Sequence, residues 1–318
     1  MTLDIVMLVG GLAILAFAAD RFVVAAARLS RRWGVSPVLV GALIVGMGTS
    51  SPELLVSVLA AVEGELDLAI GNVVGSNVTN VSMVIGVTAL VAPLVGSAKV
   101  LRREGIAMLL AVITLGVMIW DLELTRTEGL VLLGGMAVCT VLIVRWSKAD
   151  AAVGVASLEQ DTPPEVSVGK EAVLGVLSLA ATLAGAELLV RGGSSLAAAM
   201  GVGPAFIGMT VVAVGTSLPE LATSVAGVRR NESDLVVGNV LGSNLFNALA
   251  VAGSASVIGP STIAPNFRVG AIAMIVSAAL AGWFALTGRR VVRWEGMLLV
   301  IGFIAFVLLT YTEGAAPR

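Results

Sequence analysis

The 318-residue sequence contains no histidine and a single cysteine, Cys139. Without histidine the chain has no imidazole to act as an acid, a base or a metal ligand, and it cannot form a Ser-His-Asp triad. A single cysteine cannot form an internal disulfide. These absences exclude most hydrolase and redox chemistry, so we do not expect the protein to be an enzyme.

Charged residues are also scarce, at 13% of the chain, and the formal net charge is −2. Nucleic acid is therefore not an expected partner, because its binding needs clustered Lys and Arg. Hydrophobic residues make up 58% of the chain even without glycine, and the mean hydropathy is +1.02. A soluble domain is only about 45–50% apolar with glycine included. A soluble fold is thus excluded, and the lipid bilayer is the expected environment.

Ten apolar runs are long enough, at roughly 20 residues, to cross a hydrocarbon core. We therefore predict an all-α membrane protein with ten transmembrane helices. The longest polar stretch, residues 146–170, is predicted to be a flexible linker or a short surface helix. The ten runs are residues 4–27, 37–61, 68–92, 104–120, 128–145, 171–190, 204–228, 235–259, 269–287 and 294–311.

The distribution of basic residues predicts the orientation in the membrane. Most of the 19 Lys and Arg residues lie in the loops on one side, which include the linker. The positive-inside rule places that side in the cytoplasm. We therefore predict a multi-pass protein of the cell membrane with both termini extracytoplasmic and the central linker cytoplasmic.

Two motifs occur twice at one constant offset of 167 residues. Gly-Thr-Ser-Ser-Pro-Glu-Leu at 48–54 matches Gly-Thr-Ser-Leu-Pro-Glu-Leu at 215–221, and Gly-Asn-Val-Val-Gly-Ser-Asn at 71–77 matches Gly-Asn-Val-Leu-Gly-Ser-Asn at 238–244. Each half contains five spans, an odd number, so the second copy must enter the membrane from the opposite side. This predicts two inverted five-helix repeats, residues 1–145 and 171–318, with broken helices that meet at the midplane.

The repeated motifs place acidic residues deep in apolar runs. An ionised Glu53 or Glu220 there costs about 2.5–3.5 kcal/mol, and neither segment contains a Lys or Arg to pair with it. A bound cation is the simplest compensation, although one such Glu could instead be protonated and hydrogen-bonded. Pro52 and Pro219 lack an N–H, so we expect the carbonyl groups four residues earlier, at Gly48 and Gly215, to be free as ligands.

Helical spacing predicts further oxygen ligands around these carboxylates. Thr49 and Ser50 share a helix face with Glu53, and Ser76 shares one with Asn80. An all-oxygen set suits Ca²⁺ or Na⁺ rather than Zn²⁺ or copper. The second copy supplies Thr216, Ser217, Glu220, Ser243 and Asn247.

Other polar and small residues of the spans have structural interpretations. We interpret the glycines of the two Gly-Asn motifs as helix-packing contacts rather than ligands. We also predict structural ion pairs of Asp20 with Arg21 and of Glu187 with Arg191.

The paired motifs resemble the two alpha-repeats of the cation/calcium exchanger superfamily. The resemblance implies an antiporter in which Ca²⁺ and Na⁺ compete for one midplane site, and in which the first and sixth spans slide across the other eight. It implies that Ca²⁺ is coordinated by Glu53, Glu220, Thr49 and Thr216. It implies that the Na⁺ sites are completed by Ser50, Ser76, Asn80, Ser217, Ser243 and Asn247.

One position departs from part of that superfamily. Potassium-dependent members carry an aspartate where Asn247 stands, which argues against K⁺ co-transport. The short linker also lacks the large Ca²⁺-binding regulatory domain of eukaryotic members.

We therefore expect a Na⁺/Ca²⁺ antiporter that acts as a monomer by alternating access, with no covalent cofactor and with Ca²⁺ and Na⁺ as transported ions. A Ca²⁺/H⁺ antiporter remains an alternative, because two neighbouring carboxylates in apolar surroundings also bind protons. A passive cation channel is a second alternative, although a single deep acidic site between inverted repeats fits a channel less well.

Overall fold

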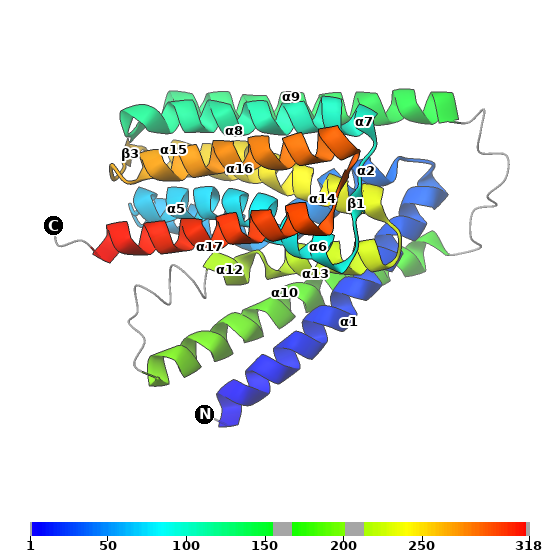
Figure 1. The fold of residues 1–318 in the computed structure, drawn as a ribbon, viewed down its shortest axis with the longest axis horizontal. Helices are drawn as coiled ribbons and strands as arrows, with labels where there is room; N and C mark the ends of the chain where they lie inside the picture. The colour runs from blue at the N-terminus through cyan, green and yellow to red at the C-terminus, as the bar shows by residue number, and fades with distance from the viewer. Residues whose placement is uncertain (1, 155–166, 201–212, 316–318) are drawn as a thin grey trace.

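The computed structural model describes residues 2–154, 167–200 and 213–315, and this part of the chain is almost entirely helical (Figure 1). Four two-residue strands supplement the helices. The elements of the first repeat are α1 (Thr2–Trp33), α2 (Pro37–Val40), η1 (Gly41–Gly46), α3 (Met47–Thr49), α4 (Ser51–Val62), α5 (Leu66–Val78), η2 (Thr79–Val84), α6 (Ile85–Val91), β1 (Leu94–Val95), α7 (Ala98–Val100), η3 (Leu101–Gly105), α8 (Ile106–Met118), η4 (Ile119–Asp121), β2 (Glu123–Leu124) and α9 (Arg126–Gly154).

The second repeat has the same order of spans within its described residues, but its fourth span is one continuous helix where the first repeat has α7, η3, α8 and η4. Its elements are α10 (Val168–Ala199), α12 (Ala213–Thr216), α13 (Leu218–Arg229), α14 (Ser233–Leu245), η6 (Phe246–Val251), α15 (Ala252–Ile258), β3 (Ser261–Thr262), α16 (Phe267–Gly288), β4 (Arg290–Val291) and α17 (Arg293–Ala315).

The predicted all-helical membrane fold with broken helices is confirmed. In the described ranges, eight continuous helices are long and apolar enough to cross a membrane. A ninth span consists of Pro37–Thr49 and Ser51–Val62, which meet at a bend of 46°. The predicted span 204–228 lies partly outside the described residues, and its described part forms α12 and α13.

Four of the predicted span boundaries are wrong by six residues or more, and one of them is the start of the fourth span, which is Ala98 rather than residue 104. The helices α1, α9 and α10 continue to Trp33, Gly154 and Ala199, past the predicted ends at 27, 145 and 190. The first part of the predicted linker, residues 146–154, is therefore a continuation of α9. Apolar runs end where charged residues begin, but a helix can continue because long charged side chains reach water or a partner.

The two small sheets relate the repeats by symmetry. β1 pairs antiparallel with β4, with Leu94 opposite Val291, and β2 pairs antiparallel with β3, with Leu124 opposite Ser261. Adding 167 to the residue numbers of β1 gives those of β3, and adding 167 to those of β2 gives those of β4. The two sheets are therefore equivalent. Figure 1 shows β1 and β3 at opposite ends of the molecule. Each sheet therefore joins one loop of each repeat, and both its loops were predicted to lie on the same side of the membrane.

The longest helices of the two repeats pack against each other in opposite directions. Gly11 of α1 lies against the backbone of Gly185 in α10, and Gly192, further along α10, lies against Asp4 near the start of α1. A Cβ atom at Gly11 would come within 2.9 Å of the Gly185 carbonyl oxygen. Because α1 and α10 are equivalent elements, their antiparallel contact is consistent with the inverted arrangement. In Figure 1 this pair runs obliquely to the remaining helices.

The interior of the molecule is formed by the third span of each repeat. The most apolar 18-residue stretch of Ser233–Ile258 is 94% buried inside the protein, and that of Leu66–Val91 is 78% buried. These two spans carry the second repeated motif, so the fold places that motif at the centre of the protein and away from lipid.

Candidate functional site

Both predicted acidic ligands lie next to a break in a helix. The backbone of Ser50, between α3 and α4, and of Ser217, between α12 and α13, leaves the helical conformation, with φ −84° and ψ 11° for Ser50 and φ −90° and ψ 5° for Ser217. A proline follows within the first turn of the next helix, where its missing N–H costs no hydrogen bond. Glu53 and Glu220 occupy those first turns. The positive end of each helix dipole therefore lies near a carboxylate.

The tertiary structure brings the two carboxylates to one place. Both side chains are 0% exposed. Ser50 Oγ donates a hydrogen bond to Glu220 Oε1 at 2.7 Å, so the break of the first repeat contacts the acidic residue of the second. Glu53 lies close enough to Glu220 for direct electrostatic interaction.

The hydroxyl groups of the first motif cross between the repeats. The pair from the first repeat lies beside the carboxylate of the second, and the pair from the second repeat lies beside the carboxylate of the first. The crossing residues are Thr49 and Ser50 beside Glu220, and Thr216 and Ser217 beside Glu53. A single pocket of oxygen atoms therefore draws on both repeats.

Three of the four carboxylate oxygens have no hydrogen-bond donor. These atoms are Oε1 and Oε2 of Glu53 and Oε2 of Glu220, and all three are buried. Among the described residues, neither carboxylate forms an ion pair with Lys or Arg. Buried charge without a partner is strongly destabilising. In their ionised form the two carboxylates have the negative charge and the unpartnered lone pairs that bind a cation.

The third spans supply the remaining predicted ligands. Ser76 and Asn80 belong to α5 and η2, and Ser243 and Asn247 belong to α14 and η6; all four are at most 1% exposed. The hydroxyl group of Ser76 and the side-chain amides of Asn80 and Asn247 make no hydrogen bonds. Ser243 differs, because its hydroxyl group donates to the carbonyl of Gly46 at 3.2 Å. Of the ten predicted ligands, nine are thus fully buried, and only Thr216 is partly exposed.

The two asparagines lie in wide helical turns that the sequence pattern did not predict. η2 (Thr79–Val84) and η6 (Phe246–Val251) are π-helical and lie at equivalent positions of the repeats. A π turn widens the helix locally and is frequent at functional sites. Its occurrence at both copies ties this backbone feature to Asn80 and Asn247.

Of the two backbone carbonyls expected to be free, that of Gly48 is not. The carbonyl of Gly48 accepts a hydrogen bond from Ser51 Oγ at 2.7 Å, so it is not an unpartnered ligand as expected. In the second repeat Leu218 replaces Ser51 and has no hydroxyl group. The carbonyl of Gly215 therefore lacks the equivalent donor.

Asn72 and Asn239 were not predicted as functional residues, but they position the site. Asn72 Nδ2 donates to the backbone carbonyl of Glu53 at 3.1 Å and to Ser57 Oγ at 3.0 Å. Asn239 Nδ2 donates to Ser224 Oγ at 3.1 Å, among other contacts. Both asparagines belong to the duplicated Gly-Asn motif, which was the available sequence signal.

The packing interpretation of the motif glycines is confirmed for the second repeat. A Cβ atom at Gly238 would meet the carbonyl oxygen of Val38 at 2.3 Å, and one at Gly242 would meet that of Ala42 at 2.2 Å. The equivalents of these partners, residues 205 and 209, lie outside the described residues. α14 therefore contacts the α2 and η1 segment backbone to backbone, which brings Ser243 close to the first repeat.

The predicted ion pairs are confirmed in one case and wrong in the other. Glu187 pairs with Arg191 at 2.6 Å. Asp20 instead pairs with Arg230, in the turn after α13, and Arg21 pairs with Glu171 of α10. A neighbour in sequence points to a different face of a helix, so partners on other elements are closer.

The chemistry of the donor set is that of a hard-cation site. Within the described ranges, no group of three or more His, Cys, Asp and Glu side chains could hold a metal ion. Two carboxylates are instead surrounded by neutral hydroxyl and amide oxygens. Such ligands suit Na⁺ and Ca²⁺.

The chain is similar to known membrane proteins. The sequence matches the family described as sodium/calcium exchanger protein over residues 3–145 and 170–312, one match for each repeat. The inner membrane protein YrbG of Escherichia coli (strain K12) is 34% identical over 317 residues, which is 98% of both chains. The sodium/calcium exchanger MaX1 of Methanosarcina acetivorans is 30% identical over 349 residues, covering 98% of this chain and 99% of MaX1.

The fold is also similar to a solved structure. The sodium-calcium exchanger NCX_Mj, soaked with Na⁺ and Sr²⁺, aligns with a TM-score of 0.84 and 30% sequence identity over 100% of this chain and 99% of that chain.

Proposed function

Because the chain belongs to the sodium/calcium exchanger family, we propose that it exchanges Na⁺ for Ca²⁺ across the membrane by alternating access at the site between Glu53 and Glu220. The protein is a multi-pass membrane transporter and not an enzyme. The names of MaX1 and NCX_Mj support Na⁺ and Ca²⁺ as the two exchanged ions, and the name of YrbG supports an inner membrane location.

The observation that carries the proposal is the set of three buried carboxylate oxygens without a donor. Two ionised carboxylates in this position repel each other and lose their hydration. One Ca²⁺ ion neutralises both charges, and two or more Na⁺ ions do the same. The same residues therefore support competitive binding of either substrate.

The surrounding oxygen atoms support a division of the ligands between the two ions. In this proposal Ca²⁺ is held by Glu53, Glu220, Thr49 and Thr216. The Na⁺ ions additionally use Ser50, Ser76, Asn80, Ser217, Ser243 and Asn247. Neutral hydroxyl and amide oxygens around the carboxylates favour Na⁺ over H⁺ as the coupling ion, because a proton needs no such cage.

The electrostatics of the pair support obligatory exchange. With either substrate bound, the site is close to neutral and can change its access from one side of the membrane to the other. Without ions, two uncompensated carboxylates would cross a region of low dielectric constant at high cost. Exchange is then favoured over leakage.

We propose the orientation and organisation predicted from the sequence. Residues 1–145 and 171–318 form the inverted repeats, the linker 146–170 is cytoplasmic, and both termini are extracytoplasmic. Pairing of β1 with β4 supports this topology, because both loops were independently expected on the basic side. The chain is proposed to work as a monomer, because one chain contains residues of both repeats at a single site.

Flux measurements in proteoliposomes test the proposal. Ca²⁺ uptake is measured in vesicles loaded with Na⁺, and separately in Na⁺-free vesicles with an acidic interior. We expect uptake to be driven by the outward Na⁺ gradient. Uptake driven only by protons would replace the proposal with Ca²⁺/H⁺ exchange, and uptake that needs neither gradient would indicate a channel.

A further inference from the structure

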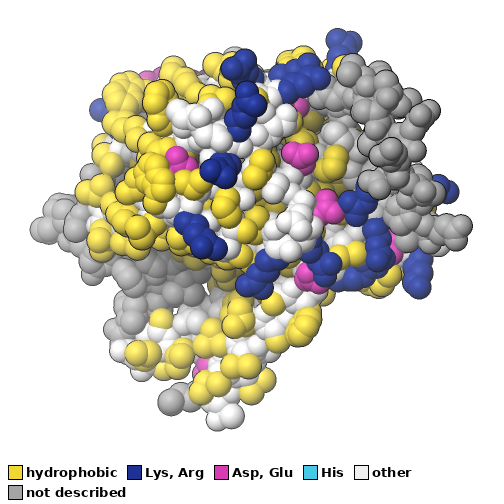
Figure 2. Space-filling view, turned by 45° about the vertical axis from the view of Figure 1, so that its right-hand side comes forward, with side chains coloured by type: hydrophobic (Ala, Val, Ile, Leu, Met, Phe, Trp, Pro, Cys, Tyr) yellow, Lys and Arg dark blue, Asp and Glu magenta, His cyan; other side chains and the backbone are white. Residues whose placement is uncertain are grey.

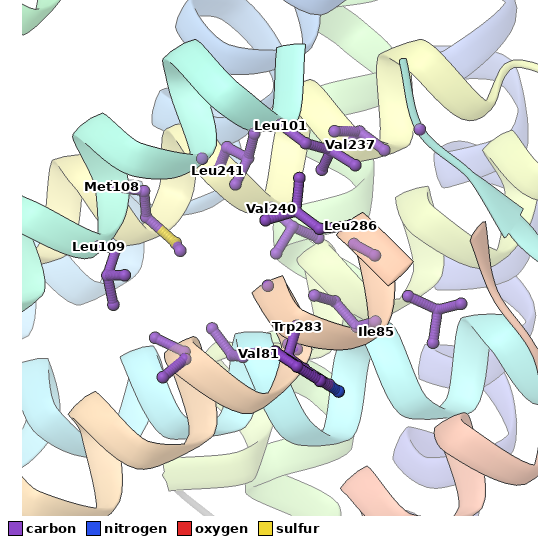
Figure 3. Close-up of a pocket in the computed structure, with 18 of the residues that line it drawn as sticks. Val81, Ile85, Leu101, Met108, Leu109, Val237, Val240, Leu241, Trp283 and Leu286 are labelled. Carbon is purple, nitrogen blue, oxygen red and sulfur yellow. The ribbon is translucent and has the colours of Figure 1, made fainter. Parts of the chain in front are cut away.

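A crevice between α8 and α16 is lined by none of the ten proposed ligands and has no part in the proposed exchange. Its volume is about 250 Å³. Figure 3 shows side chains from four regions of the chain around it: η3 with α8, α14, α16, and η2 with α6. Every residue that lines it is apolar or glycine. An apolar cavity of this size does not favour water, so an apolar occupant fits it better.

The crevice extends from one end of the helices to the centre of the protein. Leu94 and Val291, from the paired strands β1 and β4, line its outer end. Val81 and Val240 line its inner end, and they directly follow Asn80 and Asn239 in the chain. An elongated occupant would therefore reach from the membrane surface to the elements that carry the cation site.

The side of the crevice faces the lipid. Among the residues that line it, Trp283 is 65% exposed, Ile106 is 48% exposed and Leu286 is 45% exposed. These residues lie on spanning helices, so the exposed surface contacts hydrocarbon. Tryptophan is also typical of the interface between lipid and water. A lipid acyl chain can enter this crevice from the bilayer without crossing water.

Two basic residues are chain neighbours of residues that line the crevice, Arg102 of Leu101 and Arg290 of Val291. Arg102 precedes Ile106 by four residues and therefore lies on the same face of its helix, and Arg290 is paired in the sheet with Val95. Both arginines are exposed, as is the neighbouring Arg289. Figure 2 shows many Lys and Arg side chains, with fewer Asp and Glu side chains among them, on the face that includes this end of the molecule.

The acidic residues nearest in sequence do not offset this charge at the surface. Glu104 of η3 is 5% exposed, and Glu295 of α17 is 7% exposed. Within the described part of the chain, Arg102, Arg289 and Arg290 form no ion pair with an acidic side chain. The exposed rim is therefore positively charged.

We propose that this crevice binds one anionic phospholipid, with an acyl chain between α8 and α16 and the phosphate group at Arg102 and Arg290. The apolar lining selects the chain, and the basic rim selects the charge of the headgroup. The acyl chain then packs against η2 and α14, the two elements that carry Asn80 and Ser243, and supports them. This binding does not depend on the proposed ion exchange.

Two glycines allow the crevice to be filled without disturbing the fold. Gly105 and Gly282 line it, and a Cβ atom at either position would meet no atom within 4 Å. Gly282→Leu and Gly105→Leu therefore place a side chain in open space. Gly302→Leu is the matched control, because Gly302 is also in a helix with nothing within 4 Å but does not line the crevice.

Native mass spectrometry of the full chain in detergent, titrated with phosphatidylglycerol or phosphatidylcholine, tests the proposal. We expect the wild type and Gly302→Leu to retain one phosphatidylglycerol. Retention should fall roughly tenfold in Gly282→Leu and Gly105→Leu, the effect of displacing about two methylene groups. Equal retention by both filled variants and the wild type would overturn the proposal.

The headgroup contribution is tested separately with the double variant Arg102→Gln and Arg290→Gln. Lys148→Gln, an exposed position on α9, is its control. We expect the double variant to lose the preference for phosphatidylglycerol over phosphatidylcholine and the control to keep it. An unchanged preference in the double variant, or no preference in the wild type, would refute the role of the arginines.

Discussion

Ser50 Oγ donates a 2.7 Å hydrogen bond to Glu220 Oε1, whereas the equivalent pair, Ser217 and Glu53, makes no hydrogen bond. Ser243 and Ser76 show the same kind of inequality, because only Ser243 has a partner. Two repeats with nearly identical motifs thus have different contacts at the site. The site is therefore asymmetric in this structure, as expected for inverted repeats that exchange roles when the open side changes.

The inequality predicts different effects for two equivalent substitutions. Ser50→Ala removes a hydrogen bond to a buried carboxylate and should cost about 1.5–3 kcal/mol of stability in the ion-free protein. Ser217→Ala removes no hydrogen bond in this conformation and should cost less. The melting temperatures of the two variants, measured in detergent without Na⁺ or Ca²⁺, give the comparison. Equal decreases would contradict the prediction.

The carboxylates should be necessary for Ca²⁺ binding but not for folding. Glu53→Gln and Glu220→Gln keep the side-chain volume and remove one of two like charges, so the ion-free protein should fold. The affinity for Ca²⁺ should fall by at least about 100-fold, or about 2.7 kcal/mol. Stabilisation of the protein by added Ca²⁺ reports this affinity.

Glu187→Gln serves as the control for this pair, because Glu187 is an exposed residue in an ion pair on α10. It should bind Ca²⁺ as the wild type does. Stabilisation by Ca²⁺ that persists in Glu53→Gln or Glu220→Gln would be incompatible with the proposed site.

Asn72 should act by positioning Glu53 rather than by binding the ion. Asn72→Ala leaves the carbonyl of Glu53 and the hydroxyl of Ser57 without this donor, which should destabilise the protein by about 1–3 kcal/mol. Ca²⁺ affinity should fall less than in Glu53→Gln, because all the ligands remain. Titration of Ca²⁺ by calorimetry compares the two variants, with the exposed Asn266→Ala as control. A loss in Asn72→Ala as large as in Glu53→Gln would make Asn72 a ligand.

The contact between α14 and η1 should not tolerate a methyl group. A Cβ atom at Gly242 would lie 2.2 Å from the carbonyl oxygen of Ala42 and 2.4 Å from its Cα. Both partners are backbone, so Gly242→Ala should cost at least about 1–3 kcal/mol. Gly302→Ala, with nothing nearby, should be neutral or slightly stabilising because alanine favours the helix. The melting temperature should therefore fall in Gly242→Ala and stay level or rise slightly in Gly302→Ala.

The paired strands provide a test of the inverted topology. In a Cys139→Ala background, Val95→Cys with Arg290→Cys should form a disulfide across β1 and β4, because opposite residues have Cβ atoms about 4.5–5.5 Å apart. Glu123→Cys with Thr262→Cys should do the same across β2 and β3.

In intact cells, a membrane-impermeant thiol reagent should label the reduced cysteines at positions 123 and 262, the second pair. It should not label those at positions 95 and 290, the first pair. Labelling of both pairs from outside would contradict the proposed topology, and labelling of the first pair alone would reverse the orientation.

The sequence alone determined the membrane class and the repeats, and it predicted Glu53 and Glu220 as the acidic residues of the site. Long apolar runs leave few alternatives, because a backbone in lipid must satisfy its own hydrogen bonds. The constant offset of 167 residues predicted the equivalence later seen in η2 and η6 and in the two sheets. Spacing within one helix also predicted that Ser76 and Asn80 share a helix face, because local geometry is sufficient for predictions of this kind.

Only the tertiary structure decided which repeat contacts which. Ser50 shares a helix face with Glu53 in sequence, yet its hydrogen bond is to Glu220, 170 residues away. Asp20 pairs with Arg230 rather than with its neighbour Arg21 for the same reason. Helix periodicity gives the direction of a side chain on its own helix, whereas the close approach of α14 to η1 depends on packing between elements. The exchange of contacts between the repeats, and the unequal state of two nearly identical motifs, are therefore properties of the folded chain.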